Sequence, residues 1–184
     1  DKKKSIGSFG YRSFSLRDRD GFVQKDSLLE TSKSKNAIRV YVYVRGLPFV
    51  DLAFLRKKDL QGNVLSYRRR KTGHTLRVLL SPEALQLVRM VSNKDENSPY
   101  LFPILHSKEG TEAAYKEYQS ALRRFNYQLS TLKTHLNMSS HLSSYSARHT
   151  WATMAYYCEI HPGIISEAMG HSSIIVTETY LKPF

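Results

Sequence analysis

Three residue types that together suit phosphodiester chemistry lie in the segment 144–184. Arg148 stands in a helix-like run, His171 directly follows Gly170, and Tyr180 lies close to the end of the chain. A guanidinium can neutralise a phosphate, a hydrogen-bond donor can steady its oxygens, and a phenol oxygen can attack phosphorus. The pattern therefore predicts part of a strand-transfer site.

Composition points to a polyanionic partner. The 184 residues include 28 Lys and Arg but 16 Asp and Glu, which gives a formal net charge of +12 and a pI near 9.8. Nucleic acid is the first candidate for such a balance, and a merely soluble basic protein is the alternative. The length favours one domain with a real core.

The lone Cys158 excludes an intrachain disulfide and a cysteine-based zinc site. It lies in an apolar run, so we expect it to be buried in packing rather than used as a nucleophile. No apolar run is long enough to span a bilayer and no signal peptide is visible, which predicts an intracellular protein without a membrane partner.

Local patterns predict the elements that must position these residues. Segment 35–45 is rich in β-branched and aromatic residues, and its propensity alone favours a strand. Strand-like segments on either side of Lys71 predict a β-hairpin with that lysine at its tip. Helical patterns, turn signals and caps then predict a helix start at 26–31 and helices at 49–56, 82–91, 111–137, 142–159, 163–169 and around Tyr180.

Several separated motifs recur in the order of a known family. They are RGLPFVDL from Arg45, YRRRKTG from Tyr67, LFP from Leu101, RHTWAT from Arg148, MGHS from Met169 and TYL from Thr179. Together they resemble the tyrosine recombinases of the phage integrase family over roughly residues 35–184. Their variant wording is similar to integrases of Bacteroidetes mobile elements.

The resemblance implies an α+β, mainly α-helical DNA breaking-rejoining catalytic fold with a small β-hairpin sheet. It implies a catalytic domain over residues 26–184, with 1–25 as a linker or lead-in and without the N-terminal core-binding domain that family members carry. The implied activity is site-specific cutting and rejoining of DNA. A 3′-phosphotyrosyl intermediate keeps the bond energy, so no ATP, metal or other cofactor is expected.

The resemblance also implies roles for individual residues. Tyr180 matches the nucleophile and Arg148 the second arginine, which can place two donors on phosphate oxygens. His171 matches a late His/Trp position that donates to the phosphate, and Lys71 matches the general acid that protonates the leaving 5′-oxygen. The alternatives are a packed tyrosine, a surface ion pair, a helix-capping histidine and a hairpin that only grips phosphates.

Two positions depart from the family pattern. Tyr145 stands where a histidine is usual, and a phenol cannot shuttle protons near neutral pH as imidazole can. Pro48 stands where the first arginine is usual, and we expect Arg45, about one helical turn earlier, to supply the guanidinium. The family has a helix at 35–45, where Ile38, Tyr41, Val42 and Arg45 would share one face, and we follow it over local propensity.

Double-stranded DNA with attachment sites is the expected partner, in the bacterial cytoplasm near the nucleoid. Further basic residues are expected to line the duplex, namely Arg56, Lys57, Arg68, Arg70, His74, Arg123 and Arg124. Family enzymes act as tetramers, whereas this chain alone is expected to be monomeric. The alternative functions are relaxation of supercoils, as in type IB topoisomerases, and DNA binding by the same fold with reduced or lost catalysis.

Overall fold

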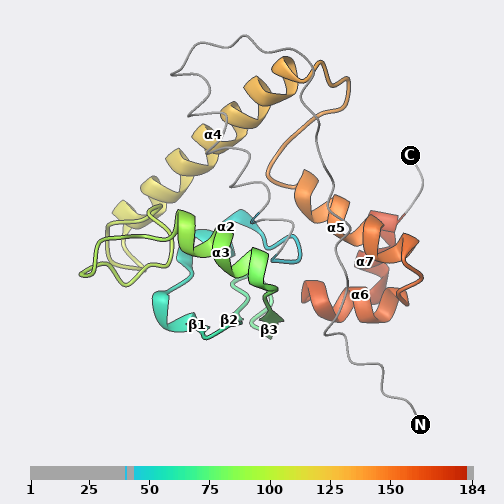
Figure 1. The fold of residues 1–184 in the computed structure, drawn as a ribbon, viewed down its shortest axis with the longest axis horizontal. Coiled ribbons are helices and arrows are strands. Elements are labelled where there is room, and N and C mark those ends of the chain that lie inside the picture. The colour runs from blue at the N-terminus through green and yellow to red at the C-terminus, as the bar shows by residue number, and fades with distance from the viewer. Residues whose placement is uncertain (1–39, 41–43, 182–184) are drawn as a thin grey trace.

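The computed structural model describes Val40 and residues 44–181. The predicted lead-in 1–25 and the helix start predicted at 26–31 lie outside these residues. In chain order the elements are α2 (Phe49–Phe54), the 3-10 helix η1 (Lys57–Asp59), β1 (Leu60–Gln61), β2 (Val64–Arg68), β3 (Thr75–Leu79), α3 (Pro82–Val91), α4 (Glu112–His135), α5 (Ser146–Tyr157), α6 (Pro162–Met169) and α7 (Ile174–Leu181) (Figure 1). This confirms the predicted mainly helical fold with a small sheet.

The sheet is antiparallel, and β2 lies between β1 and β3. In the β2–β3 hairpin, Tyr67 lies opposite Leu76. The turn is closed by a backbone bond of 2.8 Å from the N–H of Arg69 to the carbonyl of His74. The predicted hairpin with Lys71 at its tip is therefore confirmed, with each strand slightly shorter than predicted.

Most of the buried apolar side chains that the structure describes gather in one cluster, the main core, which extends from Val40 to Ala147. Alternation along β2 directs Leu65 and Tyr67 into it, as expected for a strand with one covered face. Helix α2 packs against the long helix α4, where the rings of Phe49 and Phe125 lie 5.4 Å apart. Burial of such side chains drives the packing of this part.

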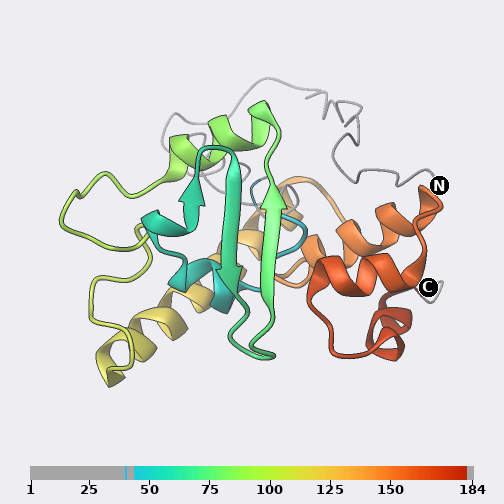
Figure 2. The same ribbon diagram turned by 90° about the horizontal axis from the view of Figure 1, so that it is seen from below.

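Helices α5, α6 and α7 form a separate group beside the hairpin (Figures 1 and 2). Their buried centre, the C-terminal cluster, consists of Ala152, Ile165 and Met169, with partly buried neighbours that include Tyr180. Helix α5 connects the two clusters, because Ala147 belongs to the main core and Ala152 to the C-terminal cluster. Arg148 therefore lies at the boundary between them.

Helix ends mostly agree with the sequence patterns. Ser81 caps α3 by accepting the N–H of Ala84 at 3.2 Å. Gly170 ends α6 in the left-handed conformation with φ 64°, as predicted for a C-cap. Helix α5 begins at Ser146 rather than 142, because Ser143 instead forms a local turn in which its N–H bonds the Ser146 hydroxyl at 2.9 Å.

Two further expectations need comment. Val40 is helical and its carbonyl accepts the N–H of Val44 at 2.9 Å, which agrees with a helix rather than a strand there, while 35–39 and 41–43 lie outside the described residues. The expectation that Cys158 is buried is wrong. It follows the last residue of α5 as the C-cap, and its side chain is exposed.

Candidate active site

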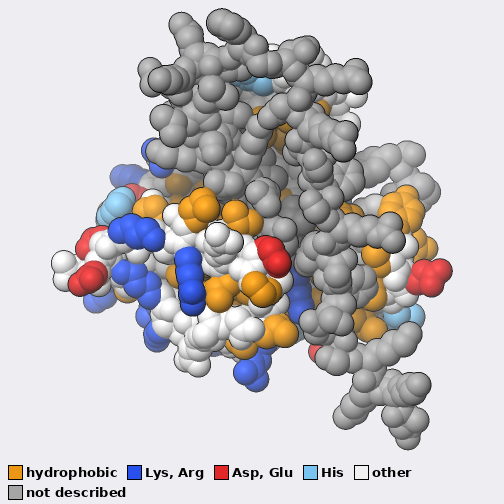
Figure 3. Space-filling model, viewed as in Figure 1, with side chains coloured by type: hydrophobic (Ala, Val, Ile, Leu, Met, Phe, Trp, Pro, Cys, Tyr) orange, Lys and Arg blue, Asp and Glu red, His pale blue; other side chains and the backbone are white. Residues whose placement is uncertain are grey.

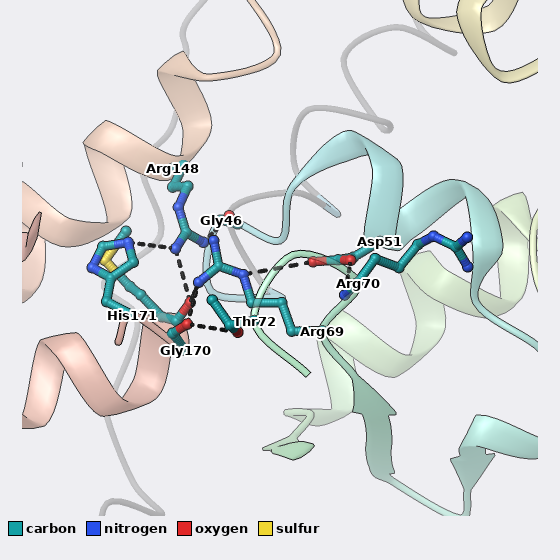
Figure 4. Close-up of polar contacts among 9 residues, drawn as sticks. Gly46, Asp51, Arg69, Arg70, Thr72, Arg148, Gly170 and His171 are labelled. Atoms are coloured by element: carbon teal, nitrogen blue, oxygen red, sulfur yellow. Dashed lines mark hydrogen bonds and ion pairs between the residues drawn. The ribbon is translucent and has the colours of Figure 1, made fainter. Parts of the chain in front are cut away.

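Arg148 is almost completely buried, with 2% of its surface exposed. Helix α5 directs its guanidinium toward the end of α6, where Nη2 donates to the Met169 carbonyl at 2.8 Å and to Nε2 of His171 at 2.8 Å (Figure 4). Its Nη1 donates to the Gly46 carbonyl at 2.9 Å. Burial and the charge of Arg69 lower the pKa of Arg148. Arginine titrates so far above neutrality that the group stays a cation.

Gly46 lets the chain pass directly against α5. Its φ is 63°, and a Cβ there would lie 2.4 Å from the Cα of Arg148. A side chain therefore cannot be accommodated without moving backbone. This close approach brings the Gly46 carbonyl within reach of the Arg148 side chain.

His171 is held by bonds at both ring nitrogens. Arginine can only donate, so Nε2 of His171 accepts from Arg148, and Nδ1 carries the proton that it donates to Oγ1 of Thr177 at 2.8 Å. Burial, followed by the charges of Arg148, Arg69 and Lys71, lowers the pKa of His171 to about 4. The imidazole is therefore neutral at pH 7. In this arrangement Nε2 serves Arg148 as an acceptor, whereas the sequence led us to expect a phosphate donor.

Tyr180 of α7 lies between two histidine rings and beside the cation. Its ring centroid is 4.4 Å from that of His149 and 5.3 Å from that of His171. The Cζ of Arg148 lies 5.9 Å from the Tyr180 centroid. Arg148, His171 and Tyr180, which were predicted together from sequence, are thus brought to one place. Burial lowers the pKa of His149, so that ring is also neutral at pH 7.

The hairpin adds a residue that sequence reasoning did not place in the site. Arg69 is 5% exposed, and its Nη1 donates to the carbonyls of Met169, at 2.9 Å, and Gly170 (Figure 4). The signal was present in the strand, since alternate positions Leu65 and Tyr67 are apolar and Arg69 continues the same face.

Lys71 lies exposed in the hairpin turn, and the Oγ1 of its neighbour Thr72 donates to the Gly170 carbonyl at 3.3 Å. The turn is therefore attached to the end of α6. The charge of Lys71 contributes to the lowered pKa of His171, so its field reaches the buried residues.

Tyr145 and Arg45, which were predicted as site residues, lie differently from the central group. Tyr145 precedes α5 and is 52% exposed, with its ring 6.2 Å from that of His149. Arg45 is half-buried in a left-handed conformation with φ 60°, next to Gly46 with φ 63°. Two consecutive left-handed residues interrupt any helical turn between Arg45 and Pro48, which corrects the expected helical offset between them.

Basic residues predicted to line DNA differ in their contacts. Arg56 and Arg70 both pair with Glu109, and Arg70 also lies over the Phe54 ring at 3.9 Å. Exposed members are Arg68, His74, Arg123 and Arg124, while Lys57 donates to the Asp95 carbonyl. Lys and Arg side chains spread over the α3 and strand half of the face in Figure 3, and apolar side chains are prominent on the half formed by α5–α7.

Within the part of the chain that the structure describes, no group of His, Cys, Asp and Glu side chains could hold a metal ion. None of the described helices is both long and apolar enough to cross a membrane.

The architecture, the buried arginine and histidine and the partly buried tyrosine define a tyrosine recombinase catalytic fold. The sequence model described as "Phage integrase family" matches residues 24–184, so the chain belongs to that family. No curated protein sequence matches the chain.

Solved structures agree on the fold. XerA recombinase is 16% identical with a TM-score of 0.57, over 92% of this chain and 61% of its own. The Tn1549 transposon integrase in complex with transposon right end DNA is 15% identical with a TM-score of 0.56, over 91% of this chain and 63% of its own. A lambda integrase dimer bound to a COC′ core site is 14% identical with a TM-score of 0.56, over 94% of this chain and 51% of its own. The chain thus spans about three fifths of the first two structures.

Proposed function

We propose that this chain cuts and rejoins DNA through a covalent phosphotyrosine at Tyr180. The observation that carries the proposal is the position of the phenol ring, which lies beside the buried guanidinium of Arg148 and between two neutral imidazoles. Family membership and the fold shared with DNA-bound integrases support DNA as the partner.

In the proposed reaction the Tyr180 oxygen attacks phosphorus, and the bond from phosphorus to the 5′-oxygen breaks. A 3′-phosphotyrosine and a free 5′-hydroxyl result, and attack by another 5′-hydroxyl reverses the step. Arg148 neutralises the charge that develops on the non-bridging oxygens. The His149 imidazole lies beside Tyr180 and can accept its proton, whereas Nε2 of His171 already accepts from Arg148.

Lys71 is proposed as the acid that protonates the leaving 5′-oxygen. Its turn is attached to the end of α6 and its charge acts on His171, which supports a place at the edge of the site. Tyr145 is proposed to border the site through its contact with the His149 ring. A further proposal is that the exposed basic residues of the hairpin and α4 contact phosphates.

The proposal extends to the setting of the reaction. We infer attachment sites on a mobile element as targets and a tetramer on two duplexes as the active assembly. The solved lambda integrase dimer on a core site supports action as an oligomer. The wording of RGLPFVDL and YRRRKTG supports an element of Bacteroidetes, with the enzyme at work in the bacterial cytoplasm.

The test uses covalent capture. Purified protein is incubated with a pool of nicked duplexes whose central sequence is randomised, so that cleavage releases a short fragment and traps the adduct. We expect a band that survives denaturing electrophoresis and peptide mapping that locates the DNA on Tyr180. Tyr180→Phe should form none while keeping its thermal stability. Adducts that persist in Tyr180→Phe, or their absence from the wild type, would refute the proposal.

A DNA-binding protein without catalysis is the second candidate. Pro48, which offers no side-chain donor, and the exposed Tyr145 favour it, because both replace groups that the family uses at the reacting phosphate. This candidate predicts binding of the same duplex pool with no adduct at any time. Relaxation of plasmid supercoils independent of sequence would instead indicate topoisomerase-like action.

A further inference from the structure

We propose that Arg69, from the β2–β3 hairpin, supplies the second guanidinium that binds the scissile phosphate, in the position that Pro48 leaves without a donor. The inference rests on the proposed function and assigns a further phosphate-binding residue to it. It differs from the expectation that Arg45 fills this role.

Position is the first argument. Arg69 and Arg148 are both almost completely buried, and both donate to the Met169 carbonyl, at 2.9 and 2.8 Å. Donors that share one acceptor must lie close together, and Figure 4 shows the two guanidinium groups side by side near His171. Two planar forks in this arrangement can present donors to the same phosphate.

Charge is the second argument. Buried ions are costly unless paired, and like charges repel strongly where water is excluded. The carboxylate beside this pair is Asp51, whose Oδ2 lies 3.8 Å from Nε of Arg69, beyond hydrogen-bond distance. Its Oδ1 accepts the backbone N–H of Arg70 at 2.9 Å. Two cations therefore share one carboxylate, and an incoming phosphodiester would balance the charge.

Donors without acceptors are the third argument. The Nε atoms of Arg69 and Arg148 are both buried and have no hydrogen-bond partner. Buried polar groups in native proteins are nearly always bonded. Nε of Arg69 lies 3.8 Å from the equally unbonded Oδ2 of Asp51, so the unused donor that points to a ligand is Nε of Arg148. A phosphate oxygen is the acceptor that matches two guanidinium groups.

The arginines on either side of Arg69 make other contacts. Arg68, the last residue of β2, donates to the Gly73 carbonyl at 2.9 Å, and Arg70 in the turn pairs with Glu109. Arg45 is half-buried, and its charge acts on Tyr67 as those of Arg69 and Arg148 do, so the test below includes an Arg45 variant. Of the three consecutive arginines, Arg69 is the buried one.

A structural tether is the competing role, because Arg69 also joins the hairpin to Met169 and Gly170. The test separates the two by removing charge from the DNA. A captured attachment sequence is synthesised with either an ordinary scissile phosphate or a neutral methylphosphonate. The rate of adduct formation is measured for wild type, Arg69→Ala, Arg45→Ala, Arg148→Ala and the exposed control Arg89→Ala.

If Arg69 binds the phosphate, Arg69→Ala should slow cleavage of the phosphodiester at least 100-fold. On the neutral methylphosphonate, at least 10-fold of that lost rate should be recovered. If Arg69 were only a structural tether, Arg69→Ala should slow adduct formation equally on both substrates. Arg69→Gln, which keeps donors to the carbonyls, should show the same recovery without loss of thermal stability. Equal loss on both substrates, cleavage within threefold of wild type, or recovery by Arg45→Ala alone would overturn the assignment.

A measurement without cleavage distinguishes failure of this inference from failure of the proposed function. In the Tyr180→Phe background, binding of a non-specific duplex is followed against salt concentration. Arg69→Gln should reduce the log–log slope by about 0.9, the value for one phosphate contact. If the wild type never forms an adduct, the proposed function fails. The slope then decides alone, and an unchanged slope rejects Arg69 as a phosphate ligand.

Discussion

The main core gathers buried apolar side chains from α2, the hairpin, α3 and α4, whereas the buried centre of the C-terminal cluster consists of Ala152, Ile165 and Met169. Polar bonds compensate for this small centre. Arg69 and Arg148 both donate to Met169, and Thr72 donates to Gly170. The segment from α6 to α7, which contains His171 and Tyr180, is therefore positioned by the same arginines that we propose as phosphate ligands.

The contact between the hairpin and α6 also bears on the mechanism. A phosphate that binds Arg69 and Arg148 would change the charge at the contact that holds α6 against the hairpin. DNA binding and the position of Tyr180, the proposed nucleophile, would then be coupled through shared residues. Variants that affect one region more than the other can test this coupling.

The largest effect is expected where Gly46 passes against α5. In Gly46→Ala the new Cβ would meet the Arg148 Cα at 2.4 Å, and the left-handed φ of 63° adds strain. We expect a loss of about 3 kcal/mol in the free energy of unfolding and at least a 100-fold loss of adduct formation. Denaturant titration and the capture assay measure both.

Gly62→Ala is the matched control for that substitution. Its φ is 61°, yet nothing lies within 4 Å of the added Cβ, so it should show the conformational cost of about 1 kcal/mol without loss of cleavage. Equal effects of the two substitutions would mean that the contact with α5 is not what makes Gly46 necessary.

A pair of core truncations compares the two regions directly. Leu105 of the main core and Ile165 of the C-terminal cluster are both fully buried. Leu105→Ala should cost about 3 kcal/mol and raise hydrogen exchange throughout the described fold. Ile165→Ala should cost about 2 kcal/mol and raise exchange chiefly in α6 and α7. Exchange in β2 and β3 that rises as much as in α6 would contradict two separable regions.

Much of this arrangement could be predicted from sequence. Turn and cap residues placed the hairpin and α6, and motif order brought Arg148, His171 and Tyr180 together. The contact of Gly46 with Arg148 could not be predicted, because it joins backbone segments 102 residues apart. Arg69 was hidden among three consecutive arginines, although strand alternation from Leu65 and Tyr67 marked it as the inward one. The exposed Cys158 shows that apolar neighbours alone do not establish burial.

An intermediate effect is expected from pH. The folded-state pKa of His171 is about 4, below its ordinary value of 6.5, because burial and nearby cations disfavour the charged ring. The unfolded chain therefore binds the extra proton between about pH 6.5 and pH 4, and stability falls as the pH is lowered through this window. Between pH 7 and pH 5, His171 should account for a loss of about 2 kcal/mol in the free energy of unfolding.

His171→Gln should be less sensitive to pH over the same range, since glutamine does not titrate. Chemical denaturation of both proteins at pH 7, 6 and 5 isolates the contribution as a difference between them, while other titrating groups cancel. Parallel pH profiles would show that His171 is not kept neutral by its surroundings, and the C-terminal cluster would then lack this pH-sensitive element.

The smallest effect tests how His171 is oriented. Thr177 is fully buried, and its hydroxyl accepts the Nδ1 proton, which leaves Nε2 to accept from Arg148. Thr177→Val keeps the shape but removes the acceptor, so the buried N–H loses its bond or the ring changes tautomer and meets Arg148 with a second donor. Either result should cost about 1 kcal/mol in the free energy of unfolding. Thr177→Ser, which keeps the hydroxyl, should retain the Nδ1-protonated tautomer in imidazole nitrogen NMR spectra. If Thr177→Val changed neither the tautomer nor the stability, Arg148 alone would orient the ring.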